Sequence, residues 1–227
     1  MPASEQLSTV QVSAKGTQRR SLETRRKIVV AALEDFSRRG FEGASTRSIA
    51  ALAGVALARV TYHFESKEAL WKAVAGHVFE LLEKRLTSRA EGLAGVDDGT
   101  KMRLLLREWI TFTADHPQLH RFMQQETMSR TERLEWLVDK HVRPRFLELQ
   151  EQFLDGEDGL RLRAPLRTAH PGHLYYLLIG AAATPYAAAD EFELLTGVAP
   201  DAGGLVEQHV DLVLALFFED ASTKEEG

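Results

Sequence analysis

Residues 45–67, STRSIAALAGVALARVTYHFESK, decide the fold, because two short helical patterns meet there at one glycine. The hydroxyl of Thr46 can cap the first helix by accepting hydrogen bonds from the free amides of its first turn. Apolar residues follow at helical spacing as far as Gly54, which tolerates the left-handed conformation found where helices end. A second helix is predicted over about residues 56–63, with Val60 directed inward. The stretch therefore predicts two short helices joined by a tight turn.

This layout is typical of a helix-turn-helix, in which the second helix enters the major groove of DNA. An ordinary helical hairpin with a polar surface would show a similar turn. Two neighbouring segments favour the helix-turn-helix. A basic amphipathic helix is predicted over about residues 22–39, and another helix begins at residues 66–68, directly after the pair.

The longer segment from Arg25 to Val74, RRKIVVAALEDFSRRGFEGASTRSIAALAGVALARVTYHFESKEALWKAV, resembles the TetR-type transcriptional regulators. It has, in order, a helix ending in FSRRGF, then Thr-Arg-x-Ile-Ala, Ala-Gly-Val and x-x-His-Phe-x-Ser-Lys-Glu-x-Leu. The resemblance implies an all-α protein, in which an N-terminal three-helix head with the helix-turn-helix is joined by a long helix to an all-helical bundle for effector binding and dimerisation. Ala56 stands where the family usually has Ser, Thr or Glu, and Thr61 where Tyr is common. The operator sequence therefore stays open.

The residues expected to contact DNA follow from the resemblance and from side-chain chemistry. They are Arg25, Thr46, Arg47, Leu57, Ala58, Arg59, Thr61, Tyr62, His63 and Lys67. Arg59 can make the bidentate contact with guanine that discriminates between bases by about 1–3 kcal/mol. Leu57 and Ala58 could meet thymine methyl groups. His63 and Lys67 match positions that contact phosphates in the family.

Charge is unevenly distributed along the chain. All 227 residues together carry 28 Lys+Arg and 33 Asp+Glu, a net charge of -5. Residues 1–67 contain 11 basic and 6 acidic side chains, a net charge of +5, whereas the remainder contains 17 basic and 27 acidic ones, a net charge of -10. Because DNA repels the acidic part, this asymmetry favours docking through the N-terminal part only.

Composition excludes several classes of protein. The absence of cysteine excludes disulfides, thiolate metal sites and a cysteine nucleophile. No apolar run approaches membrane-spanning length and the N-terminus has no hydrophobic signal region, so a cytoplasmic protein without a membrane partner is expected. His116 and His120 are four residues apart and could share a helix face, as zinc ligands can. Because no third ligand lies at a suitable spacing, neither a metal nor a cofactor is predicted.

Three parts are predicted along the chain: a disordered basic arm (residues 1–20), a helix-turn-helix domain (21–66), and a helical effector-binding and dimerisation domain (67–227). Whether the arm contacts DNA stays open. Helices are predicted from Lys67 to about Arg89 and then over about 101–114, 118–128, 131–154, 172–189 and 205–219. Pro144 lies inside a helical pattern and should kink that helix near Val142.

The last two predicted helices are unusually apolar. The helix over 172–189 is apolar on nearly all sides, and the helix over 205–219 has a broad apolar face. Such helices are buried on several sides. Burial inside one subunit is one possibility. The resemblance implies the other, a four-helix bundle with the same pair from a second subunit. A homodimer would read the two half-sites of a palindromic operator.

The resemblance also implies a small-molecule effector pocket in the helical body. A pocket needs apolar walls with a few polar groups, and buried ionisable groups need partners. The candidates on the middle helices are Trp109, Phe112, Phe122, Met123, Glu126, Trp136, His141, His173 and Tyr176. For the aromatic candidates, plain core packing is the alternative.

The expected function is that of a TetR-like regulator whose affinity for double-stranded DNA is controlled by a small molecule, with repression the common outcome in the family. A helical dimer that binds DNA without sequence preference is the first alternative. A helical enzyme is the second, but the chain has no nucleophile elbow, HExxH motif, dinucleotide-binding loop or kinase motif.

Overall fold

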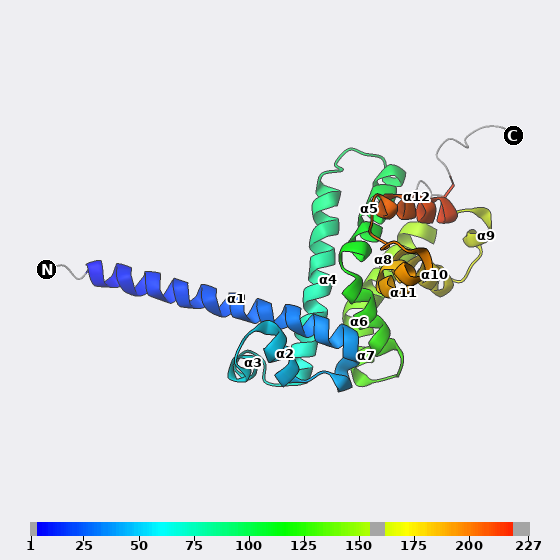
Figure 1. Cartoon of the computed structure of the whole chain (residues 1–227). Helices are drawn as coiled ribbons and strands as arrows, with labels where there is room; N and C mark the ends of the chain where they lie inside the picture. The colour runs from blue at the N-terminus through cyan, green and yellow to red at the C-terminus, as the bar shows by residue number, and fades with distance from the viewer. Residues whose placement is uncertain (1–3, 155–161, 220–227) are drawn as a thin grey trace. The chain divides into compact units, whose positions relative to one another are not determined.

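The computed structural model describes residues 4–154 and 162–219 (Figure 1). Every regular element within these residues is helical, and their isolated β-bridge pairs Leu162 with Phe218. The prediction of an all-α protein is therefore confirmed. The chain forms two compact units that divide between His77 and Val78.

The first unit, called the head below, contains α1 (Ser4–Gly43), α2 (Thr46–Ala53), α3 (Leu57–His63) and the start of α4 (Lys67–Glu91). In Figure 1, α2 and α3 lie beside the C-terminal half of α1. The apolar stripe predicted for α1 forms the core there, since Ile28, Ala32 and Phe36 are almost completely buried. α1 breaks its helical geometry at Gly40, where a φ of 68° suits glycine. Phe41 then stacks on Phe36 with 6.0 Å between the ring centroids.

Two predicted boundaries differ from the structure. α1 begins at Ser4, so most of the arm expected to be disordered is helical, and residues 1–3 lie outside the described residues. Gly16 is the single glycine of this segment and Pro2 its only proline, so little stops a helix nucleated in the packed part from propagating backward. The head also extends past the predicted end at residue 66, because Leu70, Trp71 and Val74 of α4 are buried.

The capping residue of α2 is Ser45 rather than Thr46. Ser45 has extended backbone geometry and its hydroxyl accepts from the amide of Ser48, while the hydroxyl of Ser48 accepts from the amide of Ser45. This reciprocal pair satisfies two free donors at once and fixes Thr46 as the first helical residue. Gly54 ends α2 at a φ of 63°, as predicted.

The second unit, called the body below, contains the rest of α4 and the remaining helices. They are α5 (Asp98–Asp115), α6 (Pro117–Thr127), α7 (Glu132–Leu137), the π-helix η1 (Val138–Val142), α8 (Arg143–Leu154), α9 (Ala164–Arg167), α10 (Pro171–Ala187), α11 (Ala189–Thr196) and α12 (Leu205–Phe217). The sequence analysis missed α9 and α11. The interruption expected near Val142 is present as η1, just before Pro144.

The core of the body lies where α5, α10 and α12 meet. Ile110, Ala182 and Val210, one from each helix, are completely or almost completely buried. The buried hydroxyl of Thr113 lies within hydrogen-bonding distance of the carbonyl oxygens of Ile110 (2.7 Å) and Ala182 (3.0 Å), so it links α5 to α10. These three helices form one wall of the body.

Candidate nucleic-acid interface

α3 buries one side and exposes the other. Val60 and Phe64 are buried, as the four-residue spacing predicted. The exposed side carries Leu57, Ala58, Arg59, Thr61 and Tyr62. Tyr62 has the most exposed ring of the head, at 73%. The hydroxyl of Thr61 donates within the helix to the carbonyl of Ala58 (3.2 Å), which leaves the Tyr62 hydroxyl better placed for an outside partner.

Two cations of the helix-turn-helix have no acidic partner. Arg47 in the first turn of α2 and Arg59 on α3 are exposed, and within the described residues neither side chain forms an ion pair or hydrogen bond. Some other exposed arginines of the head are paired with a carboxylate. Arg38, for example, pairs with Glu34 at 3.5 Å along α1. The helix-turn-helix thus presents positive charge that no described carboxylate of the head pairs with.

His63 and Arg25 occupy the flank of this surface. Burial, followed by the charges of Arg25 and Arg59, lowers the pKa of the His63 imidazole below its usual 6.5. The ring is therefore neutral at pH 7, and its Nε2 atom is buried without a hydrogen-bond partner among the described residues. The guanidinium of Arg25 lies 5.1 Å from the ring centroid of Phe64, a cation–π contact that directs it toward α3.

Lys67, predicted to contact a phosphate, is partly engaged within the head. Its ammonium group donates to the carbonyl oxygens of Phe41 (2.8 Å) and Ala44 (3.2 Å). It also lies 4.2 Å from the ring centroid of Phe41. Because an ammonium has three donors, two of them are engaged within the head. This role depends on residues more than twenty positions away, so the local sequence motif gives no sign of it.

The body contains a cavity of about 1000 Å³ whose lining residues all belong to the body. Four predicted ligand-binding residues line it: Trp109, Met123, His141 and Tyr176. Five other candidates lie elsewhere: Phe112, Phe122, Glu126, Trp136 and His173. Phe112 and Phe122 are buried in the core, and Glu126 is buried beside Arg133 at 3.4 Å. His173 is exposed next to His170, and Trp136 packs edge-on against His141.

The cavity wall contains charged side chains (Glu83, Lys140, Arg145 and Glu148) and also a group of histidine and tyrosine side chains that stay neutral. Burial lowers the pKa values of His116 and His120, and burial together with Lys140 and Arg145 lowers that of His141. Burial raises the pKa of the Tyr175 phenol to about 12, so the phenol keeps its proton at pH 7. The cavity therefore combines apolar walls with both uncharged hydrogen-bonding groups and charged side chains.

Sequence reasoning considered His116 and His120 only as metal ligands and missed Tyr175 altogether. Within the described residues, no group of three His, Asp or Glu side chains could hold a metal ion. The two histidines are four residues apart at the start of α6, and both line the cavity. This shared helix face was the sequence signal for a polar part of the cavity wall. Within residues 4–154 and 162–219, each helix is too short or too polar to cross a membrane.

Comparisons with known proteins agree with this geometry. Residues 28–74 match the family model of bacterial regulatory proteins, tetR family. The chain is 30% identical over 119 residues to the HTH-type transcriptional regulator RutR of Escherichia coli K12, a match that covers 52% of this chain and 55% of RutR. It is 29% identical over 105 residues to the HTH-type regulator YttP of Bacillus subtilis, with 46% of this chain and 51% of YttP covered. The chain thus spans about half the length of the curated relatives it matches.

Similarity of fold extends further than similarity of sequence. The crystal structure of AibR in complex with isovaleryl coenzyme A and operator DNA superposes with a TM-score of 0.60 at 20% identity. The match covers 86% of this chain and 98% of AibR, so head and body helices both have counterparts in that fold. Residues 28–74 of the chain thus match the tetR family of bacterial regulatory proteins, and they lie within an all-helical architecture.

Proposed function

We propose that this protein is a transcriptional regulator that binds a palindromic DNA operator as a homodimer and releases or holds it according to a small molecule bound in the body. The observation that carries the proposal is the pair Arg47 and Arg59, which are exposed and unneutralised on the helix-turn-helix of a tetR-family domain. Operator DNA is bound by AibR, whose fold is similar.

Each exposed residue of the head has a proposed role set by its chemistry. Arg59 reads a guanine through a bidentate contact, and Leu57 and Ala58 meet thymine methyl groups. Arg47 and Arg25 contact phosphates, while the Tyr62 hydroxyl donates to another phosphate oxygen. His63 is neutral when free, and a neighbouring phosphate favours its protonated form.

The homodimer is proposed to form through the outer faces of α10 and α12. Val210, Val213 and Phe217 on the inner face of α12 are buried within the body. Leu212 and Leu216 lie on its other face and are more than half exposed. An apolar row on the outside of an otherwise packed helix is typical of a helix with a second partner. Two copies joined there would present two recognition helices to one palindrome.

The effector is proposed to be a mainly apolar molecule with a polar end, such as an acyl compound. The apolar walls of the cavity suit the chain, and the protonated phenol of Tyr175 and the neutral imidazole of His116 suit an uncharged or carbonyl oxygen. AibR, which binds isovaleryl coenzyme A, is a precedent for such chemistry in this fold. α4 carries cavity residues such as Leu82 and continues from the head. Ligand binding would act through its different affinity for two arrangements of the heads.

Selection of DNA from a random pool by the purified protein tests the proposal. One palindromic sequence, bound at least 10³-fold more tightly than random DNA, is expected of a specific regulator. A preference below roughly tenfold would instead support the non-specific helical dimer. A reporter gene behind the selected operator then gives the sign of regulation, for which we propose repression. The RutR and YttP matches, both named as transcriptional regulators, give no support to an enzyme.

A further inference from the structure

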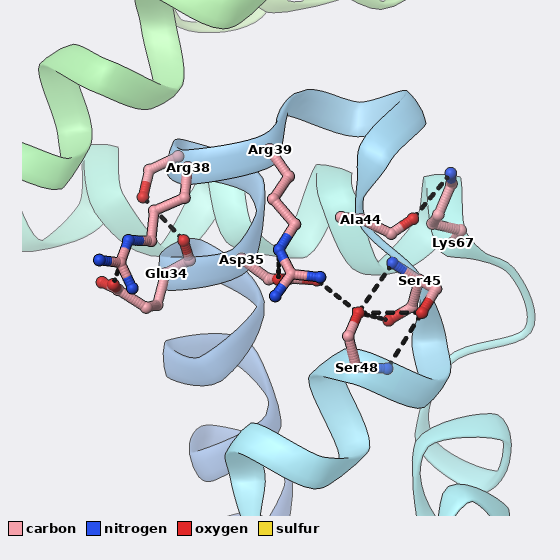
Figure 2. Close-up of polar contacts among 9 residues, drawn as sticks. Glu34, Asp35, Arg38, Arg39, Ala44, Ser45, Ser48 and Lys67 are labelled. Atoms are coloured by element: carbon pink, nitrogen blue, oxygen red, sulfur yellow. Dashed lines mark hydrogen bonds and ion pairs between the residues drawn. The ribbon is translucent and has the colours of Figure 1, made fainter.

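We propose that Asp35 and Lys67 are positioning residues that hold the connection between α1 and α2, and that Lys67 acts there rather than as a phosphate ligand. The connection is defined as residues 40–45, between the break at Gly40 and the capping residue Ser45. Asp35 on α1 acts on its C-terminal end through Ser48, and Lys67 reaches it directly from the first turn of α4. Figure 2 shows Asp35 bonded to Ser48 and Lys67 bonded to Ala44.

Asp35 is a buried carboxylate that serves α2. Its side chain is 1% exposed. It accepts a hydrogen bond from the hydroxyl of Ser48 at 2.7 Å and forms an ion pair with the guanidinium of Arg39 at 3.2 Å. A carboxylate this buried is tolerated only when it is paired and hydrogen-bonded. The neighbouring pair, Glu34 with Arg38, has the same four-residue spacing on the same helix but is 50% and 70% exposed. The difference in burial indicates that Asp35 has a structural role, whereas Glu34 with Arg38 is an ordinary surface ion pair.

The donor and the acceptor of each hydrogen bond around Ser48 can be assigned. Its hydroxyl lies within hydrogen-bonding distance of both the Asp35 carboxylate and the Ser45 carbonyl (2.8 Å), but it has one proton to donate. The carboxylate is the stronger acceptor, so the Ser48 hydroxyl donates its hydrogen bond to Asp35. Ser48 then accepts from the amide of Ser45, and its own amide donates to the Ser45 hydroxyl. The capping box of α2 is thereby anchored to a charge on α1.

Lys67 holds the other side of the connection. Its two hydrogen bonds go to Phe41 and Ala44, the residues on either side of the Glu42–Gly43 pair. The ring of Phe41, beneath the ammonium, is itself stacked on Phe36 of the core. A chain segment held at two carbonyls and one ring has little freedom to move, and α2 begins directly after it.

The consequence concerns Arg47, which lies in the first turn of α2 between Ser45 and Ser48. If the connection moves, the first turn of α2 moves with it, and the direction of the Arg47 side chain changes. This inference rests on the proposed DNA-binding function for its effect on operator binding. Its structural part can be measured without DNA.

The first test compares Asp35→Ala with Glu34→Ala in the full-length chain. Asp35→Ala should lower Tm by roughly 5 °C or more. Amide hydrogen exchange at Ser48 should become at least roughly tenfold faster. Glu34→Ala, which removes the same charge from the surface pair, should leave both unchanged. If Asp35→Ala unfolds the chain, Asp35→Asn replaces it: this variant removes the charge but keeps an acceptor for Ser48, so both changes should appear in the same direction and be smaller. Equal behaviour of the position-34 and position-35 variants would overturn the proposal.

The second test compares Lys67→Met with Lys72→Met. Lys72 is also on α4 within the head and bonds Glu68 at 2.7 Å, so both variants remove one positive charge from the head. Lys67→Met should lower Tm and speed amide exchange at Ala44. Its operator affinity should fall without a change in the salt dependence, whereas Arg47→Ala should reduce that slope by about 1. A slope reduced by about 1 in Lys67→Met, with Tm unchanged, would make Lys67 a phosphate ligand and overturn the proposal.

The two proposals fail in different ways. If the wild-type protein selects no DNA sequence, the proposed function fails, while the Tm and exchange measurements still decide whether Asp35 and Lys67 hold the connection. If a palindrome is selected but the variants keep wild-type exchange rates, the positioning roles fail and the function stands.

Discussion

The helices α3 and α12 are both amphipathic, yet the surfaces they leave exposed differ completely. α3 buries Val60 and exposes Arg59 and Tyr62, whereas α12 buries Val213 and exposes Leu212 and Leu216. Cationic and phenolic groups suit a polyanion, and leucines suit another apolar surface. In each helix the buried face packs the helix into its own unit. The chemistry of the exposed face indicates the class of partner: a polyanion for α3 and an apolar protein surface for α12.

The largest effect is expected from α12. Changing Leu212 and Leu216 together to glutamate should convert the dimer to a monomer, because four charges would meet across the proposed interface. Operator affinity should then fall at least about 10²-fold, since both half-sites no longer act together. Sedimentation and fluorescence anisotropy measure the two effects. The control is Leu194→Glu on α11, a still more exposed leucine outside the proposed interface, and this variant should remain dimeric.

On α3, Arg59→Ala should lose discrimination at one base pair of each half-site, worth about 1–3 kcal/mol. The reason is that no other side chain on the exposed face of α3 can donate two parallel hydrogen bonds to one base. Competition binding with operators changed at single positions measures it. Arg38→Ala, whose guanidinium pairs with Glu34, provides the comparison and should bind every operator as the wild type does. Uniform weakening across all operators by Arg59→Ala would assign Arg59 to a phosphate.

A third prediction separates the head from the body. Met123→Trp should fill part of the cavity and weaken binding of the apolar dye anilinonaphthalene sulfonate roughly tenfold, because added bulk excludes an occupant. Operator affinity without effector should not change. Met128→Trp, at an exposed position outside the cavity, should leave dye binding intact. Equal dye binding by the two variants would place the dye elsewhere.

The smallest effect concerns pH. Burial lowers the pKa values of His116 and His120 from 6.5, with Asp115 opposing and Arg85 assisting the shift at His116. The unfolded chain therefore binds more protons than the folded one once the pH falls to about 6.5, and stability is lost as the pH falls further. Tm should decrease between pH 7.5 and 5.5. The double variant His116→Gln, His120→Gln should flatten this dependence, and His173→Gln, at an exposed position, should retain it.

The sequence predicted the head better than the body, for physical reasons. Val60 faces inward and Gly54 ends α2 as predicted, because helical periodicity and glycine conformation are local properties. The capping residue was misplaced by one position, since Ser45 and Thr46 both carry suitable hydroxyls and the choice depends on the bonds to Ser48. The engagement of Lys67 depends on carbonyls distant in sequence, which no local pattern contains.

In the body, periodicity could identify helices but could not separate cavity walls from core. Trp109 and Phe112 lie one turn apart on α5, yet Trp109 lines the cavity and Phe112 is buried in the core. Which of two neighbouring aromatic side chains meets empty space depends on how far apart the facing helices are held. That distance is a property of the packed body and not of α5 alone.

The π-helix η1 gives the body an unusual sensitivity to chain length. A π-helical turn holds one residue more than an α-helical turn, and η1 contributes His141 to the cavity wall, where it stacks on Phe79. Deleting a single residue there would restore regular α-helical winding with little rotation of α7 relative to α8, because the π-turn holds its extra residue locally. The change would be confined to the turn that carries His141, and its stacking on Phe79 would be lost. One codon lost at this place would in this way alter a single part of the cavity wall and leave the helices on both sides in position.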